Sequence, residues 1–395
     1  MRKNTERFLK YSIILSVITA AWWLLTIAGG GTRAVVSFFH NLEKNVSAQN
    51  VTSTGYRYNE EFEKTLNHYR TFQKLYIEED STAIPGLAAT DVMGNISTQM
   101  VPQGICIAGE YMLVTAYDNS GANSVIYVLS NENPARRRLL TTIVLPDANH
   151  VGGIAYDGKR VWIAKSTTRK CSVIDYGIIQ KAAESGENSY FLEQYTQNVE
   201  CGAVASFIAY HDNRIWVGTY SNRSSGMGTL RSYDVVDGEQ LELVKQEQIT
   251  IPGFANGVSF MESEGNTYMA VSTSKGRYFH SEIYFYQVAK DIGSERNLYY
   301  NYGSCKFPPM AEEFVCDGEN TYFLFESSAT CYSTGEYTRC SYPVDRICAL
   351  STEKLFWNNQ GPVYEQPQNG VHDMLINGME RATYQDPKHY WRMYV

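Results

Sequence analysis

Carboxylate, histidine, lysine and tyrosine side chains fall at corresponding points of a two-strand pattern that this sequence repeats. Some lie where the first strand of a repeat begins, and others lie where the second strand ends. The candidates for ligand binding are Gln103, Tyr117, His150, Lys165, Tyr220, Asn256 and Glu312, and the candidates for catalysis are Asp118, Glu313 and Glu326. Carboxylates that converge with a histidine and a lysine form a polar site that can bind a ligand or hydrolyse one.

The adjacent acids Glu312 and Glu313 carry the strongest chemical signal. Side chains that follow one another in a strand point to opposite faces, so only one of the two is expected to face the site. Opposite Glu326 or Asp118, that carboxylate would form a hydrolytic pair or a Ca²⁺ site, because both need converging carboxylate oxygens. The simpler expectation is a solvated pair with a structural role only.

The basic candidates His150 and Lys165 can be explained without catalysis, and the sequence shows no zinc-binding pattern. His150 is expected to hydrogen-bond a loop, and Lys165 is as well placed for an ion pair with Glu326 or Glu313 as for chemistry. No CxxC or Cys/His spacing indicates zinc. The sequence therefore assigns no metal ligands and predicts no cofactor, with Ca²⁺ as the alternative.

The elements that position these residues are β-hairpins. The stretch HVGGIAYDGKRVWIAKS, from His150, consists of two apolar runs around an Asp157-Gly158 turn, which is a strong hairpin signal. The pattern returns from Gln103, Ala205, Asn256 and Glu312, so that an apolar column recurs about every 50 residues. This column consists of Ile105, Ile154, Phe207, Val258 and Phe314.

A period of this length with several strands per unit predicts an all-β fold, a five-bladed β-propeller, with six blades as the alternative. Third strands are predicted at 124–129, 171–176, 229–235, 282–288 and 346–350, and fourth strands at 139–145, 191–199, 243–251 and 298–305. The segment 95–100 is expected to close the ring as the outermost strand of the last blade. First-strand starts and second-strand ends then meet at one mouth of the central channel.

The flanking segments set the predicted domain organisation. Residues 1–32 combine a basic tip with an uncharged run, which predicts a single-pass signal anchor with the propeller outside the cell; a cleaved signal peptide is the alternative. A helical stalk is expected at 33–83, packed on the propeller or dimerising as a coiled coil, because Phe62, Leu66, Tyr69, Phe72 and Tyr76 form one apolar stripe. The propeller is assigned to 84–350, and an aromatic-rich tail at 351–395 is expected to pack on it.

Charge and cysteine content limit the compartment and the partners. The net charge of −8 excludes nucleic acid as a partner, because phosphate binding needs a basic surface. Eight cysteines suit an oxidising compartment. Cys331 and Cys340 flank an insertion that a disulfide would staple, and Cys171 and Cys201 are expected to be neighbours.

The repeated pattern resembles the NHL/YVTN-type superfamily of extracellular β-propellers over residues 95–350. The resemblance is carried by Gln103-Gly104-Ile105, Gly153-Ile154, Asn256-Gly257-Val258, Asp157-Gly158, Asp317-Gly318, Trp162, Trp216 and Val173-Ile174-Asp175. Glu264-Gly265-Asn266 replaces the Asp-Gly turn in the fourth repeat, and the fifth has the 331–340 insertion. Glu312-Glu313 is also slightly similar to gluconolactonase-type propellers, although further metal ligands of that type are missing.

Together these features predict a membrane-anchored extracellular propeller whose channel mouth binds a surface glycan or a protein. The alternative is an extracellular hydrolase, either a glycosidase or a lactonase-like enzyme, that uses Glu313, Glu326 and Asp118 at the same mouth.

Overall fold

The structure, a computed structural model, describes residues 56–358 without 223–226, 292–296 and 336–337. Its main body is five sheets, each built on four antiparallel strands. From the inside outward, blade one contains β4 (Met100–Ala108), β5 (Tyr111–Asp118), β6 (Val125–Ser130) and β7 (Leu139–Val144). Blade two contains β8 (Val151–Tyr156), β9 (Arg160–Lys165), β10 (Lys170–Asp175) and β12 (Gln197–Glu200). Blade three contains β13 (Phe207–His211), β14 (Arg214–Thr219), β15 (Gly228–Val236) and β16 (Glu242–Ile251).

Blade four contains β17 (Ala255–Ser263), β18 (Asn266–Thr273), β19 (Ser281–Lys290) and β20 (Asn297–Phe307). Blade five contains β21 (Ala311–Cys316), β22 (Asn320–Phe325), β23 (Arg346–Ser351) and, from the other end of the chain, β1 (Tyr76–Ala83). The innermost strands contact one another in the closed order β4, β8, β13, β17, β21 and back to β4. The prediction of a five-bladed propeller is confirmed, and the described residues form no sixth sheet of this kind.

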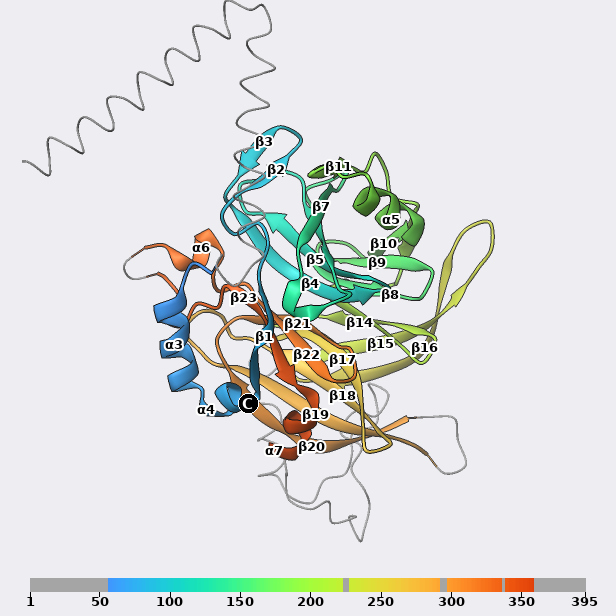
Figure 1. The fold of residues 1–395 in the computed structure, drawn as a ribbon. Helices are drawn as coiled ribbons and strands as arrows, with labels where there is room; N and C mark the ends of the chain where they lie inside the picture. The colour runs from blue at the N-terminus through green and yellow to red at the C-terminus, as the bar shows by residue number, and fades with distance from the viewer. Residues whose placement is uncertain (1–55, 223–226, 292–296, 336–337, 359–395) are drawn as a thin grey trace, which may run out of the picture. The chain divides into compact units, whose positions relative to one another are not determined.

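The strand that closes the ring is not the predicted one. β1 pairs with β23 in antiparallel register, with Tyr76 opposite Leu350 and Ala83 opposite Arg346, and Figure 1 shows the blue β1 beside the orange strands of blade five. The segment 95–100 instead contributes β3 (Asn95–Ser97), which forms a small hairpin with β2 (Thr90–Val92). Met93 and Gly94 both have positive φ, as a tight hairpin turn requires, and this turn folds the segment back on itself.

Blade two also differs from its predicted strands. The range 191–199 was expected to be one strand, but it is divided between two blades. β11 (Ser189–Phe191) pairs parallel with β7 of blade one, and β12 completes blade two. The helix α5 (Tyr176–Glu184), which the sequence reasoning missed, separates these strands from β10.

The apolar stripe before the propeller packs on blades four and five. α3 (Asn59–His68) and α4 (Arg70–Leu75) bury Phe62, Leu66 and Phe72 in a cluster that includes Phe307 and Phe325. The helix ends before its predicted limit, because Tyr76 already begins β1. This packing favours a stalk helix that lies against the propeller.

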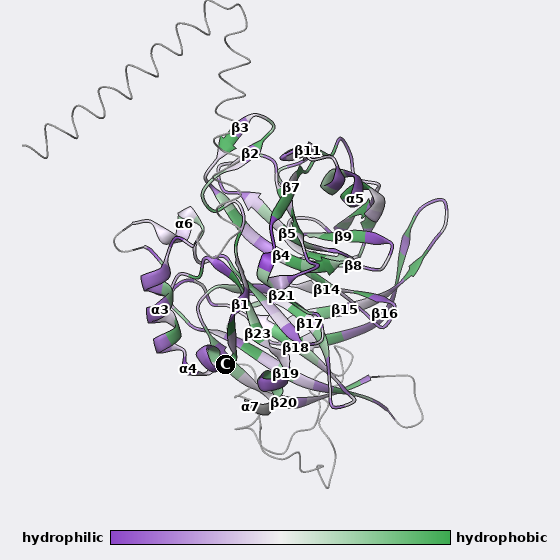
Figure 2. Ribbon diagram, in the orientation of Figure 1, coloured by the Kyte–Doolittle hydropathy of each residue, from purple (hydrophilic) through white to green (hydrophobic). Residues whose placement is uncertain are grey.

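Three short elements complete the structure: η2 (Pro134–Arg136), α6 (Thr330–Ser333) and α7 (Thr352–Asn358). Leu355 and Phe356 of α7 join the same cluster as α3 and α4. Figure 2 shows that hydrophobic residues concentrate in the strands, whereas α3 and the outer hairpin of blade three are largely hydrophilic.

The predicted anchor at 1–32, the stalk up to residue 55 and the tail beyond residue 358 lie outside the described residues. Within the described part of the chain, no helix is both long enough and apolar enough to cross a membrane.

All eight cysteines are free thiols in the structure, so the predicted Cys331–Cys340 disulfide is not formed. Cys171 and Cys201 do lie together, as expected from their positions. Their thiols share a hydrogen bond inside the apolar cluster between blades two and three.

Candidate functional site

The innermost strands approach so closely that glycine is required at three points. A Cβ atom on Gly104 would lie 2.8 Å from Cα of Gly153, and one on Gly153 would lie 2.9 Å from Cα of Phe207. A Cβ atom on Gly257 would lie 2.7 Å from Cα of Glu313. These five residues therefore mark one level of the channel, hereafter the inner ring, and the close approach explains the repeated glycine of the sequence pattern.

Blade three is shifted by one residue against the predicted column. Phe207 lies in the inner ring and Ile208 lies in the apolar column, because Trp216 pairs with Ala209 just as Trp162 pairs with Ala155. The phenyl ring of Phe207 lies over Gly218, where a Cβ atom would come within 1.9 Å of it. A large residue fits at this level only because the partner strand has glycine there.

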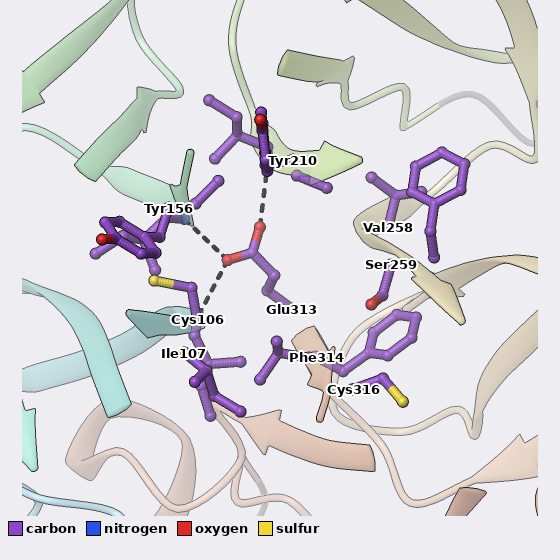
Figure 3. A pocket seen from close by; sticks show the side chains of 16 residues that line it. Cys106, Ile107, Tyr156, Tyr210, Val258, Ser259, Glu313, Phe314 and Cys316 are labelled. Atoms are coloured by element: carbon purple, nitrogen blue, oxygen red, sulfur yellow. Dashed lines mark hydrogen bonds between the residues drawn. The ribbon is translucent and has the colours of Figure 1, made fainter. Parts of the chain in front are cut away.

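A break in strand register accompanies the inner ring in four of the blades, at 102–105, 151–153, 255–257 and 311–314. Such bulges release backbone N–H groups from the strand ladder. The Glu313 carboxylate accepts two of these donors, from Ile105 at 3.0 Å and Ile154 at 2.9 Å. It accepts a third from Ile208 at 3.3 Å in blade three, where the strand register is unbroken. Glu313 thus joins the first strands of blades one, two and three to blade five, as the dashed lines in Figure 3 show.

Glu313 lies inside the channel and not at the predicted mouth. It lines a cavity of ≈ 130 Å³ together with Cys106, Tyr156, Tyr210 and Cys316, beyond the inner ring (Figure 3). Burial raises the pKa of Glu313 well above its ordinary value, while the three N–H donors oppose this rise. The contacts of Glu313 indicate a structural role.

A second, larger cavity of ≈ 400 Å³ lies at the mouth, where first strands begin and second strands end. Residues from all five blades line it: Gln103, Tyr117, His150, Gly152, Ser166, Val204, Ser206, Phe207, Tyr220, Asn256, Ser274, Gly276, Glu312, Glu326 and Tyr332. The structure therefore brings together seven of the ten sequence candidates. Tyr332, from the 331–340 insertion, was missed because it lies outside every repeat.

The acids of this mouth cavity are Glu312 and Glu326, whose carboxyl groups are hydrogen-bonded to each other. Asn256 donates from Nδ2 to Oε1 of Glu312 at 3.0 Å, and Gln103 donates from Nε2 to Oε2 of Glu326 at 3.0 Å. Burial raises the pKa of Glu326 to about 7 and raises that of Glu312 well above its ordinary value. The pair consequently holds a shared proton near neutral pH.

Aromatic rings form much of the wall. The rings of Tyr117 and His150 lie with centroids 4.4 Å apart, and the hydroxyls of Tyr117 and Tyr332 are hydrogen-bonded. Tyr220 is 41% exposed and stands at the open side. Burial lowers the pKa of His150, which keeps its imidazole neutral near pH 7.

Two further candidates are held outside the mouth cavity. Asp118 accepts from the backbone N–H of Ser120 at 2.6 Å and from the hydroxyl of Ser97, so it orders the turn after β5. Lys165 forms an ion pair with Asp147 at 2.6 Å and lies over the ring of Tyr195. The expected pairing of Lys165 with Glu326 or Glu313 is wrong, because Asp147 is its partner.

Across the described ranges, no group of three or more His, Cys, Asp or Glu side chains is arranged to hold a metal ion.

No family model and no curated protein matches this chain. Solved structures give distant matches to β-propeller proteins. The glutaminyl cyclase of Myxococcus xanthus matches with a TM-score of 0.40 and 10% identity over 64% of this chain and 91% of the other. A nidogen/laminin complex matches with a TM-score of 0.31 and 13% identity over 58% of this chain and 73% of the other. A putative 6-phosphogluconolactonase from Bacteroides uniformis matches with a TM-score of 0.33 and 14% identity over 57% of this chain and 78% of the other. These proteins include enzymes and a binding partner, and likeness at this level assigns the chain to no family and to no activity.

Proposed function

We propose that this protein is a ligand-binding propeller, tethered outside the cell by its N-terminal segment, that holds a chemical group of a glycan or protein ligand in its mouth cavity. The observation that supports it is the cavity of ≈ 400 Å³ to which every blade contributes. Concave sites with a few converging polar groups among aromatic side chains are the usual form of a ligand pocket.

The arrangement of the acids favours binding over hydrolysis. Glycosidases separate their two carboxyl groups by about 5 to 9.5 Å to accommodate the sugar and, in some, a water molecule. Glu312 and Glu326 are instead in direct hydrogen-bond contact. The other two acids of the hydrolase alternative, Glu313 and Asp118, are hydrogen-bonded elsewhere and do not line the mouth cavity.

The test is a thermal-shift screen of the full-length chain in detergent against soluble glycans, extracellular protein fragments and Ca²⁺. A ligand at a hundredfold excess over its Kd stabilises a protein by about 2.7 kcal/mol, which a melting curve resolves. We expect Tyr220→Ala to abolish the shift and Phe191→Ala to preserve it. The two side chains are matched at 41% and 40% exposure, but only Tyr220 lines the mouth cavity.

Two outcomes would contradict the proposal. A ligand that stabilises Tyr220→Ala and a mouth-filling Ser206→Trp variant as strongly as the natural protein binds elsewhere. If the natural protein hydrolyses a ligand and the Glu326→Gln variant does not, the protein is a hydrolase.

The tether and the extracellular location are supported by the basic tip and apolar run within residues 1–32. We expect the protein to stay in the membrane fraction after carbonate extraction and its propeller to be digested by protease added to intact cells. Release into the medium would instead indicate a cleaved signal peptide.

A further inference from the structure

We propose that the group held in the mouth cavity is a primary ammonium, presented by a lysine side chain of a polypeptide ligand. This inference rests on the proposed function, since it names the chemistry of the same site.

The first argument comes from the hydrogen-bond donors on the floor of the cavity. The side-chain NH₂ groups of Gln103 and Asn256 both point at the acid pair. Gln103 uses both N–H bonds, on Glu326 and on the Pro102 carbonyl, and Asn256 uses one on Glu312, so the floor presents mainly carboxyl oxygens as acceptors. An ammonium group has three N–H donors and no acceptor, so it matches this floor.

The second argument is the balance of charge and protons. Without ligand and above about pH 7, Glu312 and Glu326 share one proton, and the pair carries one negative charge. An ammonium ion that binds between the carboxyl groups takes the place of the shared proton, which leaves to solvent, and both carboxylates become ionised. The positive charge of the ammonium then cancels one of the two negative carboxylate charges. Each N–H···O contact is a charge-assisted hydrogen bond.

The third argument is the wall. Tyr117, Tyr220 and Tyr332 line the mouth cavity with aromatic rings, whose faces attract cations. No Lys or Arg is among the residues that line it. The nearby cations have partners outside the lining: Lys165 pairs with Asp147, Lys275 lies over the Phe254 ring, and Arg277 donates to the Thr338 carbonyl at 2.6 Å. The charge of Arg277 also lowers the pKa of Glu326. Anionic ligands would find no counter-charge on this lining.

The surroundings of the mouth favour a polypeptide as the source of the ammonium. The loop between β18 and β19 contributes Ser274 and Gly276 to the lining, and beyond them Tyr278 and Phe279 are 61% and 58% exposed. Exposed aromatic side chains beside a pocket are typical of protein interaction surfaces.

The test is isothermal titration calorimetry on the full-length chain in detergent, with four probes that separate the ligand sources. Nα-acetyl-lysine methylamide supplies the lysine ammonium, glycinamide an α-ammonium and glucosamine an amino sugar. Nα-acetyl-norleucine methylamide has the same apolar stem as lysine without the charge. We expect the lysine probe to bind at least tenfold more tightly than the other three.

The variants test the acid pair itself. Glu312→Gln and Glu326→Gln should each weaken the lysine probe at least tenfold, which corresponds to about 1.4 kcal/mol. Glu200→Gln is the control, because Glu200 forms an exposed ion pair with Lys170 and neither residue lines the mouth cavity. Titrations at pH 8, above the pKa of about 7 of Glu326, in buffers of different ionisation enthalpy should show the release of about one proton per ligand, which an ordinary surface ion pair would not give.

The outcomes also separate this inference from the proposed function. Equal binding of the norleucine probe, or no heat with 10 mM lysine probe, overturns the ammonium inference. If the glycan or protein panel still gives a Tyr220-dependent shift, the proposed function stands with another ligand chemistry. If glycinamide or glucosamine binds best, the site takes an ammonium and the polypeptide source is wrong. Should no ligand depend on the mouth cavity, both fail.

Discussion

Glu312 and Glu313 are consecutive in the chain, yet their carboxyl groups face two different cavities of one channel. Strict alternation along a strand would have turned one of them away from the channel. The register break between Ala311 and Phe314 removes that constraint. Blade five therefore supplies both the acid that binds the blades together and an acid of the candidate site.

The structural role of Glu313 leads to the first prediction. Glu313→Gln replaces one carboxylate oxygen by an NH₂ group, which cannot accept from the backbone N–H groups of Ile105, Ile154 and Ile208. A buried donor left unpaired costs about 1–3 kcal/mol, and we expect a loss of that size in the free energy of unfolding, measured in urea.

The matched control is Glu312→Gln, one residue earlier, which leaves the N–H contacts of Glu313 in place and should change stability less. Equal stability of Glu313→Gln and the natural protein would show that the three N–H donors do not depend on an ionised carboxylate.

The acid pair predicts a pH dependence of stability. The pKa of Glu326 is raised from 4.5 to about 7, so between these values the folded protein binds more protons than the unfolded chain. Stability should therefore fall as the pH rises from about 4.5 to about 7. Asp147 acts in the opposite direction, but only as the pH falls below about 3.8, outside this window. His150, whose pKa is lowered from 6.5, opposes the fall below about pH 6.5, so the comparison with a Glu326 variant isolates the acid.

Denaturation in urea at pH 5, 6, 7 and 8 measures this slope. Glu326→Gln cannot ionise, so its stability should be flatter across the range and should exceed that of the natural protein at pH 8. Parallel profiles for the two proteins would rule out Glu326 as the titrating group.

Periodicity was enough to predict the blades and the mouth. The recurrence of apolar columns and Asp-Gly turns placed the strands, and antiparallel order then placed Gln103, His150 and Asn256 beside Tyr117 and Tyr220. These inferences needed only local patterns that the chain repeats.

Contacts between residues far apart in the sequence could not be predicted in this way. The closing strand β1 carries no copy of the repeat, and its pairing with β23 depends on the tertiary packing of α3 and α4. The bulges that turn both Glu312 and Glu313 toward the channel leave no mark in a period-two pattern. The partner of Lys165 was missed for the same reason, since Asp147 lies in a loop outside the hairpins.

The inner ring predicts a strong effect of adding one methyl group. In Gly153→Ala the new Cβ atom would lie 2.6 Å from Oε1 of Glu313 and 2.8 Å from the backbone nitrogen of Ile208. Neither neighbour can move without breaking the hydrogen bonds across the channel, so we expect a loss of more than about 3 kcal/mol or failure to fold.

Gly177→Ala in α5 is the matched control, because no atom lies within 4 Å of the added Cβ. Alanine in a helix should stabilise that variant by about 0.5–1 kcal/mol. Folding yield and melting temperature compare the two, and a Gly153→Ala protein as stable as the natural one would contradict the close packing of the ring.

The last prediction concerns the attachment of the N-terminal helices to blade five. Asp345 accepts from the backbone N–H groups of Arg57 at 2.6 Å and Tyr58 at 2.8 Å, and it pairs with Arg346 at 3.0 Å. The Arg346 guanidinium lies between the rings of Tyr56 and Phe62, at 3.7 and 3.8 Å from their centroids. This cluster holds the start of α3, and through it β1, against the propeller.

Arg346→Met should cost about 3–5 kcal/mol, because it leaves the buried carboxylate of Asp345 without its cation. Arg214→Met is the control, since the partly exposed pair of Arg214 with Asp234 should contribute at most about 1 kcal/mol. Hydrogen exchange should accelerate over 57–83 in Arg346→Met alone, because α3, α4 and β1 are released together. Equal effects of the two variants would mean that the apolar packing of Phe62 and Phe72 is sufficient to hold α3, α4 and β1 on blade five without the Arg346 cluster.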